Sequence, residues 1–191
     1  MIKISFKDQI IGKRLILKRT RPTLKMAELI FNLIDKNRNH LEPWFPWPKF
    51  TLRVEDSLKY LFNKEEKIDK GEIIEYGLFI KDEYIGNISM FDISREDSSA
   101  EIAYWISSFK TGNGYVTEAI KLLEREAFET IGLNRIQIKC DERNKASLGV
   151  AKRCGYKYEG KFRENSFNEY FNDFANTLMF SKLKSEYIDS F

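Results

Sequence analysis

The sequence predicts a mixed α/β fold of the α+β kind, with a largely antiparallel sheet. Two observations predict this fold class. Segments with alternating apolar residues are interspersed with segments whose apolar residues recur at helical spacing. Three strand-like segments also follow one another at residues 75–81, 84–92 and 100–107, which is typical of an antiparallel meander. With 191 residues, the chain is long enough for one buried core, so we expect a single domain over residues 1–191.

The first part of the chain predicts one strand and two helices. Residues 14–19 read as a strand and residues 54–69 as an amphipathic helix. A helix is also predicted over residues 23–37, where the apolar residues at helical spacing are Met26, Leu29, Ile30, Leu33 and Ile34. Residues 37–50 hold three of the four prolines and two of the three tryptophans, which argues against a regular helix there.

The second part predicts the rest of the sheet. A turn at Asp82-Glu83 joins the first two strands of the meander into a hairpin. Asn144 and Gly155 are suited to begin and to end a short helix. The other predicted elements are a helix over 115–131, a strand over 135–141 and a final pair of strands with a turn near Asn168.

Charge and composition exclude several classes of function. The 32 basic and 29 acidic residues are interspersed, without the basic block of a nucleic-acid binder, so we expect no direct contact with nucleic acid. The N-terminal twenty residues lack a signal-peptide core, and the chain has no apolar run long enough to span a membrane, so no membrane association is expected. The sequence predicts no metal site, because Cys140, Cys154 and the single histidine, His40, lack metal-ligand spacing. We expect reduced thiols in a cytoplasmic protein, and we interpret His40 as a packing or surface residue rather than a catalytic base.

The loop Gly112-Asn113-Gly114 lies between the strand 100–107 and the helix 115–131. A helix N-terminus exposes unpaired N–H groups, and glycines before it let an anion approach the backbone. A P-loop is excluded because Tyr115 follows Gly114 where that motif needs lysine, and Thr117 stands where a dinucleotide-binding motif needs its third glycine. An anion-binding loop and an ordinary strand-to-helix turn both remain open.

Three passages of the chain carry a family resemblance. They are "LIDKNRNHLEPWFPWP", "AEIAYWISSFKTGNGYVTEAI" and "LNRIQIKCDERNKASLGVAKRCGYKYEG". All three resemble the GNAT acetyltransferase superfamily and, within it, the RimJ/RimL group of ribosomal-protein N-terminal acetyltransferases. The resemblance extends from about Gly12 to Leu183. Thr111 and Val116 depart from the loop pattern of the family, which has Gln or Arg at the first position and a small residue at the second.

The resemblance implies the GNAT fold and acetyl-CoA as the cofactor. In that fold the sheet is splayed between its fourth and fifth strands, here 100–107 and 135–141, and about four helices flank it. The pantetheine arm is expected in this gap and the pyrophosphate on the backbone amides of 112–117. The residues expected to bind the cofactor are Trp105, Ile106, Ser107, Thr111, Gly112, Asn113, Gly114, Tyr115, Val116, Thr117, Asn144 and Ser147.

Acetyl transfer needs a held thioester, a neutral amine and a proton for the leaving thiolate. By resemblance, Ser147 in "NKAS" is expected to donate that proton. Glu101 is expected to act as the base, with a salt-bridged strand carboxylate as the alternative interpretation, and Glu164 is the second candidate. The residues expected to line the acceptor groove are Trp44, Phe45, Trp47 and Glu164.

The expected acceptor is the N-terminal α-amine of a protein, of the ribosomal type. An α-amine with a pKa near 8 is about one-tenth neutral at pH 7, so it needs little help from a base. Two alternatives remain: a small amine such as a polyamine or an aminoglycoside, and a non-catalytic CoA-binding or interaction module, to which the departures at Thr111 and Val116 point. A monomer and a homodimer are both open.

Overall fold

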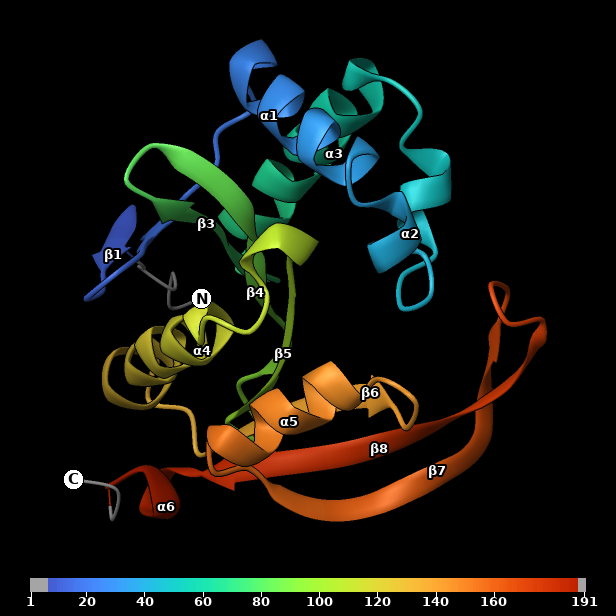
Figure 1. The fold of residues 1–191 in the computed structure, drawn as a ribbon. Helices are drawn as coiled ribbons and strands as arrows, with labels where there is room; N and C mark the ends of the chain where they lie inside the picture. The colour runs from blue at the N-terminus through green and yellow to red at the C-terminus, as the bar shows by residue number, and fades with distance from the viewer. Residues whose placement is uncertain (1–6, 189–191) are drawn as a thin grey trace.

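The computed structural model describes residues 7–188 of the chain. It contains an eight-stranded sheet with the order β1-β2-β3-β4-β5-β6-β8-β7 (Figure 1). Among the described strands, β5 and β6 pair in parallel and the other neighbours pair antiparallel. The strands are β1 (Gln9–Ile11), β2 (Ile16–Lys18), β3 (Ile74–Ile80), β4 (Glu83–Ser94), β5 (Ser99–Ile106), β6 (Arg135–Asp141), β7 (Lys157–Asn168) and β8 (Asp173–Leu183).

Helices cover both faces of the sheet. Phe79 packs with α1 (Leu24–Asp35) and α3 (Val54–Asp69), whereas its neighbour Leu78 belongs to the cluster that includes α4 (Tyr115–Arg125) and α5 (Lys145–Arg153). Because successive side chains of a strand point to opposite faces, the two helix pairs lie on opposite sides of the sheet. The short helices are α2 (Arg38–Leu41), α6 (Lys184–Ile188) and the 3₁₀ turns η1 (Trp47–Phe50) and η2 (Ser108–Lys110).

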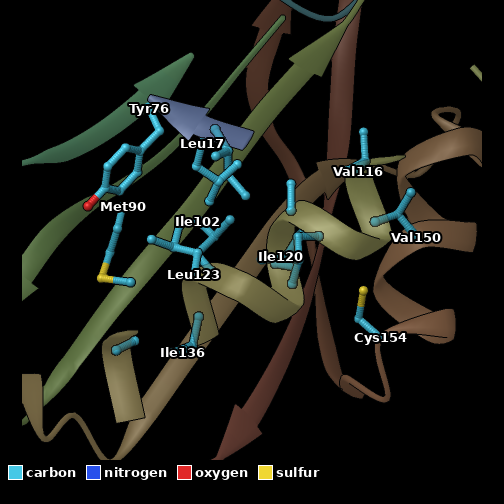
Figure 2. Close-up of a cluster of buried hydrophobic side chains, with 14 of the residues drawn as sticks. Leu17, Tyr76, Met90, Ile102, Val116, Ile120, Leu123, Ile136, Val150 and Cys154 are labelled. Atoms are coloured by element: carbon cyan, nitrogen blue, oxygen red, sulfur yellow. The ribbon is translucent and has the colours of Figure 1, made fainter. Parts of the chain in front are cut away.

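The larger core lies between the sheet and helices α4 and α5. Figure 2 shows Ile120 and Leu123 of α4 directed at strand residues that include Ile102 and Ile136. These four side chains are at most 1% exposed. Burying such a side chain contributes about 1.5–3 kcal/mol, so this contact fixes α4, and with it the loop before α4, against β5 and β6.

The structure confirms the predicted fold class, and much of the element prediction agrees with it. The helix over 54–69 and the strand over 135–141 have the predicted bounds. The hairpin of β3 and β4 and the final hairpin of β7 and β8 are antiparallel as expected. Asn144 caps α5, since its side chain accepts a hydrogen bond from the Ser147 N–H at 3.0 Å.

Three elements differ from the prediction. The strand expected over 14–19 covers Ile16–Lys18, because the chain turns at Gly12, whose N–H bonds to the Leu15 carbonyl, and β1 precedes that turn. The helix expected over 115–131 ends as a wider π turn, η3 (Glu126–Ile131). Residues 37–50, where no regular helix was expected, contain two short helical turns: α2, whose four residues all precede Pro43, and the 3₁₀ turn η1.

Gly86 holds β4 unusually close to the end of β5. It lies opposite Ile106, and its φ of 154° is a conformation that favours glycine. A Cβ atom at Gly86 would lie 2.2 Å from the carbonyl oxygen of Trp105 and 2.8 Å from the Cα of Ile106. Any side chain at this position would therefore push the end of β5 outward.

We predict that Gly86→Ala lowers the free energy of unfolding by about 2–3 kcal/mol, because the added methyl group meets backbone that cannot yield. Urea denaturation followed by circular dichroism measures this change. Gly160→Ala is the matched control in an exposed strand, where a Cβ meets nothing within 4 Å, and should change the value by less than about 0.5 kcal/mol. Equal stability of the two variants would contradict the prediction.

Candidate functional site

Strands β5 and β6 separate after three residue pairs. Their parallel ladder runs from Ser99–Arg135 to Glu101–Gln137. Beyond Glu101, β5 follows β4 as far as Ile106, while β6 follows β8 as far as Asp141. The fold therefore has the splay that the resemblance implied between these two strands.

A cleft of about 1700 Å³ occupies this opening. Its walls come from the separated parts of β5 and β6, from α4 and α5, and from the loop before α4. At one end it reaches the residues His40, Leu41, Trp44 and Phe45. The glycine loop and the aromatic segment, both singled out in the sequence, thus border one continuous cavity.

The glycine loop is shaped by left-handed backbone and by bonds to itself. Gly112 and Gly114 both have φ of 76°, and a Cβ at Gly112 would meet nothing within 4 Å. The Thr111 hydroxyl donates to the Ser108 carbonyl at 2.8 Å, and the Asn113 side chain donates to the Thr111 carbonyl at 3.0 Å. Since these side chains bond back to the loop, its outer face is backbone.

The start of α4 presents N–H groups to the cleft. The first intrahelical bond runs from the Glu118 N–H to the Gly114 carbonyl at 3.0 Å. The N–H groups of Tyr115, Val116 and Thr117 precede this bond and lie at the positive end of the helix dipole. The Val116 side chain is 8% exposed and packs into the core. Valine in place of the small residue of the family pattern therefore adds volume to the core at this position.

Arg14 fixes this loop from outside. Its guanidinium donates to the Asn113 carbonyl at 2.7 Å and to Glu118 at 2.7 Å, and it lies 5.0 Å from the ring centroid of Tyr115. Burial acts to raise the pKa of Glu118, but the hydrogen bonds from Arg14 outweigh it and hold this pKa below its usual value. The carboxylate in the first turn of α4 is thus already neutralised by a cation.

The charge of the cleft is strongly positive. Among the described residues, the three carboxylates in its lining are each paired with a cation: Glu118 with Arg14, Glu124 with Lys182 and Asp141 with Arg143. The basic residues of the lining are Lys13, Arg14, Lys110, Lys121, Arg125, Lys139, Lys145, Arg153 and Lys182. A cleft with this balance attracts a polyanionic ligand.

The end of β5 directs backbone polar groups into the opening. Ile106 lies opposite Gly86, and the N–H of Ser107 bonds to the Ile85 carbonyl at 2.9 Å. In an antiparallel ladder this pattern makes Ile106 and Gly86 a non-hydrogen-bonded pair. The N–H and C=O of Ile106 therefore point away from β4, towards the gap.

Ser107, one residue further on, does not reach the cleft. It is 3% exposed, its N–H is taken up by β4, and its hydroxyl donates to the Asn37 side chain at 3.4 Å. Strand alternation accounts for this difference from Ile106. Ser107, although expected to bind the cofactor, is therefore not among the residues that line the cleft.

The aromatic residues expected at the acceptor end divide into two sets. Trp44, Phe45 and Trp105 line the cleft. Trp47 lies behind them in the second core cluster, with its ring 5.8 Å from Trp105 and 5.6 Å from Phe45. Trp47 supports this wall, and the structure does not place it in the cleft lining.

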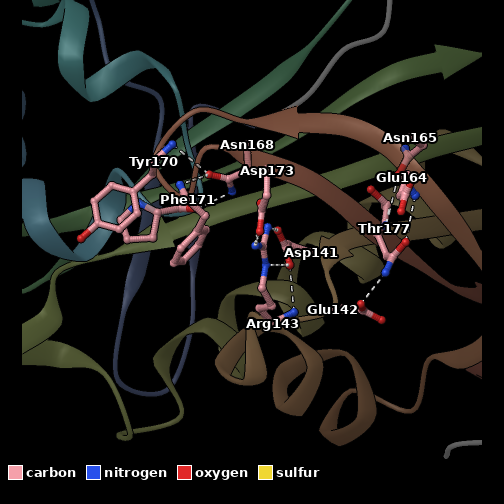
Figure 3. A network of polar contacts seen from close by, with 12 residues as sticks. Asp141, Glu142, Arg143, Glu164, Asn165, Asn168, Tyr170, Phe171, Asp173 and Thr177 are labelled. Atoms are coloured by element: carbon pink, nitrogen blue, oxygen red, sulfur yellow. Dashed lines mark hydrogen bonds and ion pairs between the residues drawn. The ribbon is translucent and has the colours of Figure 1, made fainter.

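The tip of the β7–β8 hairpin closes against this aromatic end. Arg143 links Asp141 at the end of β6 to Asp173 at the start of β8, and its guanidinium lies 4.4 Å from the ring centroid of Phe171 (Figure 3). The Asn168 side chain donates to the Pro43 carbonyl at 3.0 Å. These contacts connect the hairpin to the segment that carries Trp44.

Ser147 faces the cleft from the first turn of α5 and forms a pair with Tyr104 of β5. The two hydroxyl oxygens are 2.9 Å apart. Burial raises the pKa of Tyr104 well above its usual value, so its hydroxyl stays protonated and can donate. Tyr104 was not among the residues expected from the sequence. Its place between the inward-facing Ile102 and Ile106 of β5 is the signal that could have found it.

Neither of the carboxylates considered as the base lines the cleft. Glu101 is 8% exposed, lies where β5 and β6 are still paired, and forms an ion pair with Lys139 at 2.7 Å. Glu101 thus has the environment of a salt-bridged strand carboxylate, which was the alternative interpretation of this residue. Glu164 is exposed on β7, where its N–H bonds to the Asn176 side chain at 2.8 Å. The histidine interpreted as a packing or surface residue, His40, is in the lining.

Two further properties concern the part of the chain that the structure describes. None of its helices combines the length and apolar character that crossing a membrane requires. Over residues 7–188, no group of three or more His, Cys, Asp or Glu side chains is placed to bind a metal ion.

Known proteins resemble this chain in sequence and in fold. Residues 14–157 match the acetyltransferase (GNAT) domain family. The chain is 36% identical over 166 residues to "Putative ribosomal N-acetyltransferase YdaF" of Bacillus subtilis (strain 168), which covers 85% of this chain and 88% of that protein. It is 31% identical over 145 residues to "Ribosomal-protein-serine acetyltransferase" of Escherichia coli (strain K12), over 75% of this chain and 81% of the relative.

Solved structures agree with the sequence relatives. The crystal structure of the microcin C7 self-immunity acetyltransferase MccE, in complex with acetyl-CoA and AMP, superposes with a TM-score of 0.86 at 25% identity. The match covers 96% of this chain and 99% of that one. The chain therefore belongs to the GNAT acetyltransferase family and is an acetyl-CoA-dependent N-acetyltransferase.

Proposed function

We propose that the acceptor is the N-terminal α-amine of a protein, of the ribosomal-protein type. The observation that carries this proposal is that one cleft joins a cationic, backbone-lined end to an open aromatic end. The names of two relatives, a ribosomal-protein-serine acetyltransferase and a protein named as a ribosomal N-acetyltransferase, support the same acceptor class. A ribosomal acceptor would also place the protein in the cytoplasm.

Acetyl-CoA fits the cationic end of the cleft on structural grounds. The backbone amides of 112–117 can serve as an anion site at the start of α4, and a Cβ at Gly112 would occupy open space. The cations of the lining balance the phosphates of such a ligand. We assign the pyrophosphate to the 112–117 amides and the pantetheine arm to the free edges of β5 and β6. The cofactor supplies an acetyl group activated as a thioester.

Backbone and hydroxyl groups of the cleft can polarise the thioester carbonyl and supply a proton to the leaving sulfur. The N–H of Ile106 is directed into the gap, where it can donate to the thioester carbonyl oxygen and stabilise the charge that develops there. The hydroxyl of Ser147 can donate a proton to the leaving sulfur. Its partner Tyr104, whose oxygen is 2.9 Å away, positions that hydroxyl and can replace the proton.

The acceptor end favours a peptide N-terminus over a polycation. Polyamines and aminoglycosides carry several positive charges and need unpaired carboxylates as partners. The three carboxylates of the described cleft lining are already paired with Arg14, Lys182 and Arg143. Trp44 and Phe45, by contrast, offer flat apolar surface to the backbone and small side chains of an extended peptide.

We predict that peptides copying the N-termini of ribosomal proteins, with a free α-amine, are acetylated at least ten times more efficiently than spermidine or an aminoglycoside. The physical reasons are the lower pKa of an α-amine and the lack of unpaired acidic groups in the described lining. Thiol release with a matched panel of amines measures kcat/KM. The same peptides with a blocked N-terminus and an internal lysine are the control. Faster turnover of the small amines would reject the peptide proposal.

We predict that Gly112→Ala weakens acetyl-CoA binding about tenfold, because the methyl group fills the space in front of the loop amides. Isothermal titration calorimetry measures the Kd. Gly132→Ala is a matched control: its φ of 82° imposes the same left-handed strain, and its Cβ also meets nothing within 4 Å, but it does not line the cleft. Equal effects of the two variants on Kd would show that strain, and not the loop surface, is responsible.

We predict that Ser147→Ala lowers kcat about 30- to 100-fold and changes the Kd for acetyl-CoA less than threefold, because the hydroxyl acts on the leaving group. Tyr104→Phe, which keeps the ring and removes the bonded oxygen, should lower kcat less. Single-turnover kinetics and calorimetry separate the two effects. Ser166→Ala, on the exposed strand β7, is the control. A larger loss in Tyr104→Phe than in Ser147→Ala would transfer the role of proton donor to Tyr104.

A further inference from the structure

We propose that His40 is the general base, taking the proton from the acceptor amine as that amine attacks the acetyl group. The proposal rests on the acetyl-transfer chemistry of the family and not on which amine is the acceptor. It arises from four features of the structure: the place of His40 in the cleft lining, the fixed position of its helix, its contact with Ile106, and the absence from the described lining of both carboxylates considered for this role.

The helix that carries His40 is fixed to the end of β5 by one buried side chain. Asn37 is 2% exposed, and its carbonyl oxygen accepts hydrogen bonds from the N–H and the hydroxyl of Ser108, each at 2.8 Å. Its amide donates to the Leu33 carbonyl at 2.7 Å. Both ends of this amide are thus used, and α2 is held beside the residues that follow Ile106.

The ring of His40 is oriented by the strand that holds the thioester. Burial lowers its pKa, and a hydrogen bond with the backbone of Ile106 partly offsets this effect. Since that backbone acceptor is a carbonyl, the ring must donate an N–H to it, and in the neutral imidazole the other nitrogen carries a lone pair. The ring is half-buried and lines the cleft, so this lone pair has access to the acceptor end.

The charged groups around α2 are engaged with one another. Asp35 at the end of α1 pairs with Arg38 at 2.8 Å, and Lys49 of η1 pairs with Glu169. Lys110 of η2 pairs with Glu83 at 2.8 Å. Across the cleft, Lys139 pairs with Glu101 and Asp141 with Arg143. Glu42, which follows α2, and Lys36, which lines a second, smaller pocket together with His40, are further charged neighbours. Burial is the largest influence on the pKa of the ring and lowers it, which favours the neutral imidazole.

The proposed step balances without any further reactant. The amine nitrogen forms a bond to the acetyl carbon, and the carbon–sulfur bond breaks. The proton lost by the amine passes to the free nitrogen of His40, and the leaving sulfur takes a proton from the pair formed by Ser147 and Tyr104. The imidazolium then releases its proton to water, and the Ser147–Tyr104 pair regains one from water, so no net proton is left on the protein.

The test compares His40→Gln with Asn39→Gln, which changes an exposed residue of the same helical turn. We expect His40→Gln to lower kcat about 100-fold, within the range for general bases, while the Kd for acetyl-CoA changes less than threefold. In the wild type, log kcat/KM should fall with a slope of two at low pH, because the imidazole and the amine both gain protons. In His40→Gln the slope should be one. Asn39→Gln should match the wild type in both respects.

Chemical rescue provides a second readout that a structural role would not produce. Added imidazole should restore part of the kcat of His40→Ala and none of the activity lost in Ser147→Ala. An unchanged low-pH slope in His40→Gln, together with an effect confined to the KM of the acceptor and no rescue, would overturn the proposal and leave His40 as a wall of the acceptor site.

The pKa of His40 can also be measured without any substrate, because it is the single histidine of the chain. Its ring signals in an NMR titration are therefore unambiguous, and we expect a pKa below 6.5. A ring that is still protonated at the pH of the kinetic assay would overturn the proposal, because an imidazolium has no lone pair to accept the proton of the amine. If peptides prove inactive and a small amine is accepted, the same kinetic comparison uses that amine, so failure of the acceptor proposal is distinguished from failure of the assignment of His40.

Discussion

The site depends on one constraint in the pairing of the strands. β5 pairs along its length with β4, and β6 pairs along its length with β8, whereas β5 and β6 pair with each other only briefly. β5 follows β4 and β6 follows β8, so the two strands share three residue pairs and then separate. Backbone polar groups in a protein interior need partners, and here a stretch of each strand edge is left for a ligand to satisfy. The gap is therefore both a binding surface and a source of oriented donors, and the side chains around it act on what those donors hold.

The surroundings of the gap keep its edges in place. Gly86 brings β4 into close contact with the end of β5, and Asn37 fixes the residues that follow. Arg14 holds the glycine loop, and Arg143 connects the end of β6 to the last hairpin. Preorganised donors stabilise developing charge without reorganisation, so rigidity at these points contributes directly to acetyl transfer.

Local sequence signals were sufficient for most of the fold, and the glycine loop that they single out borders the cleft. The helix over 54–69 and the strand over 135–141 were predicted from apolar periodicity alone, because packing reinforces their intrinsic pattern. The first strand and α2 were harder, since a turn at Gly12 and a single helical turn leave little periodicity. Strand alternation explains why Ser107 points away from the gap that Ile106 faces. Nothing local to His40 predicts its place, because that depends on Asn37 bonding to Ser108, which is 71 residues later in the chain.

The short ladder between β5 and β6 also divides the sheet mechanically. Strands β1–β5 are paired in sequence on one side, and β6–β8 form a second unit on the other. A ligand that bonds to both free edges becomes part of the joint between these units, and its binding free energy adds to the cohesion of the whole sheet. A ligand bound in the gap is therefore expected to hold the two units together more firmly, so that the empty protein has the looser sheet.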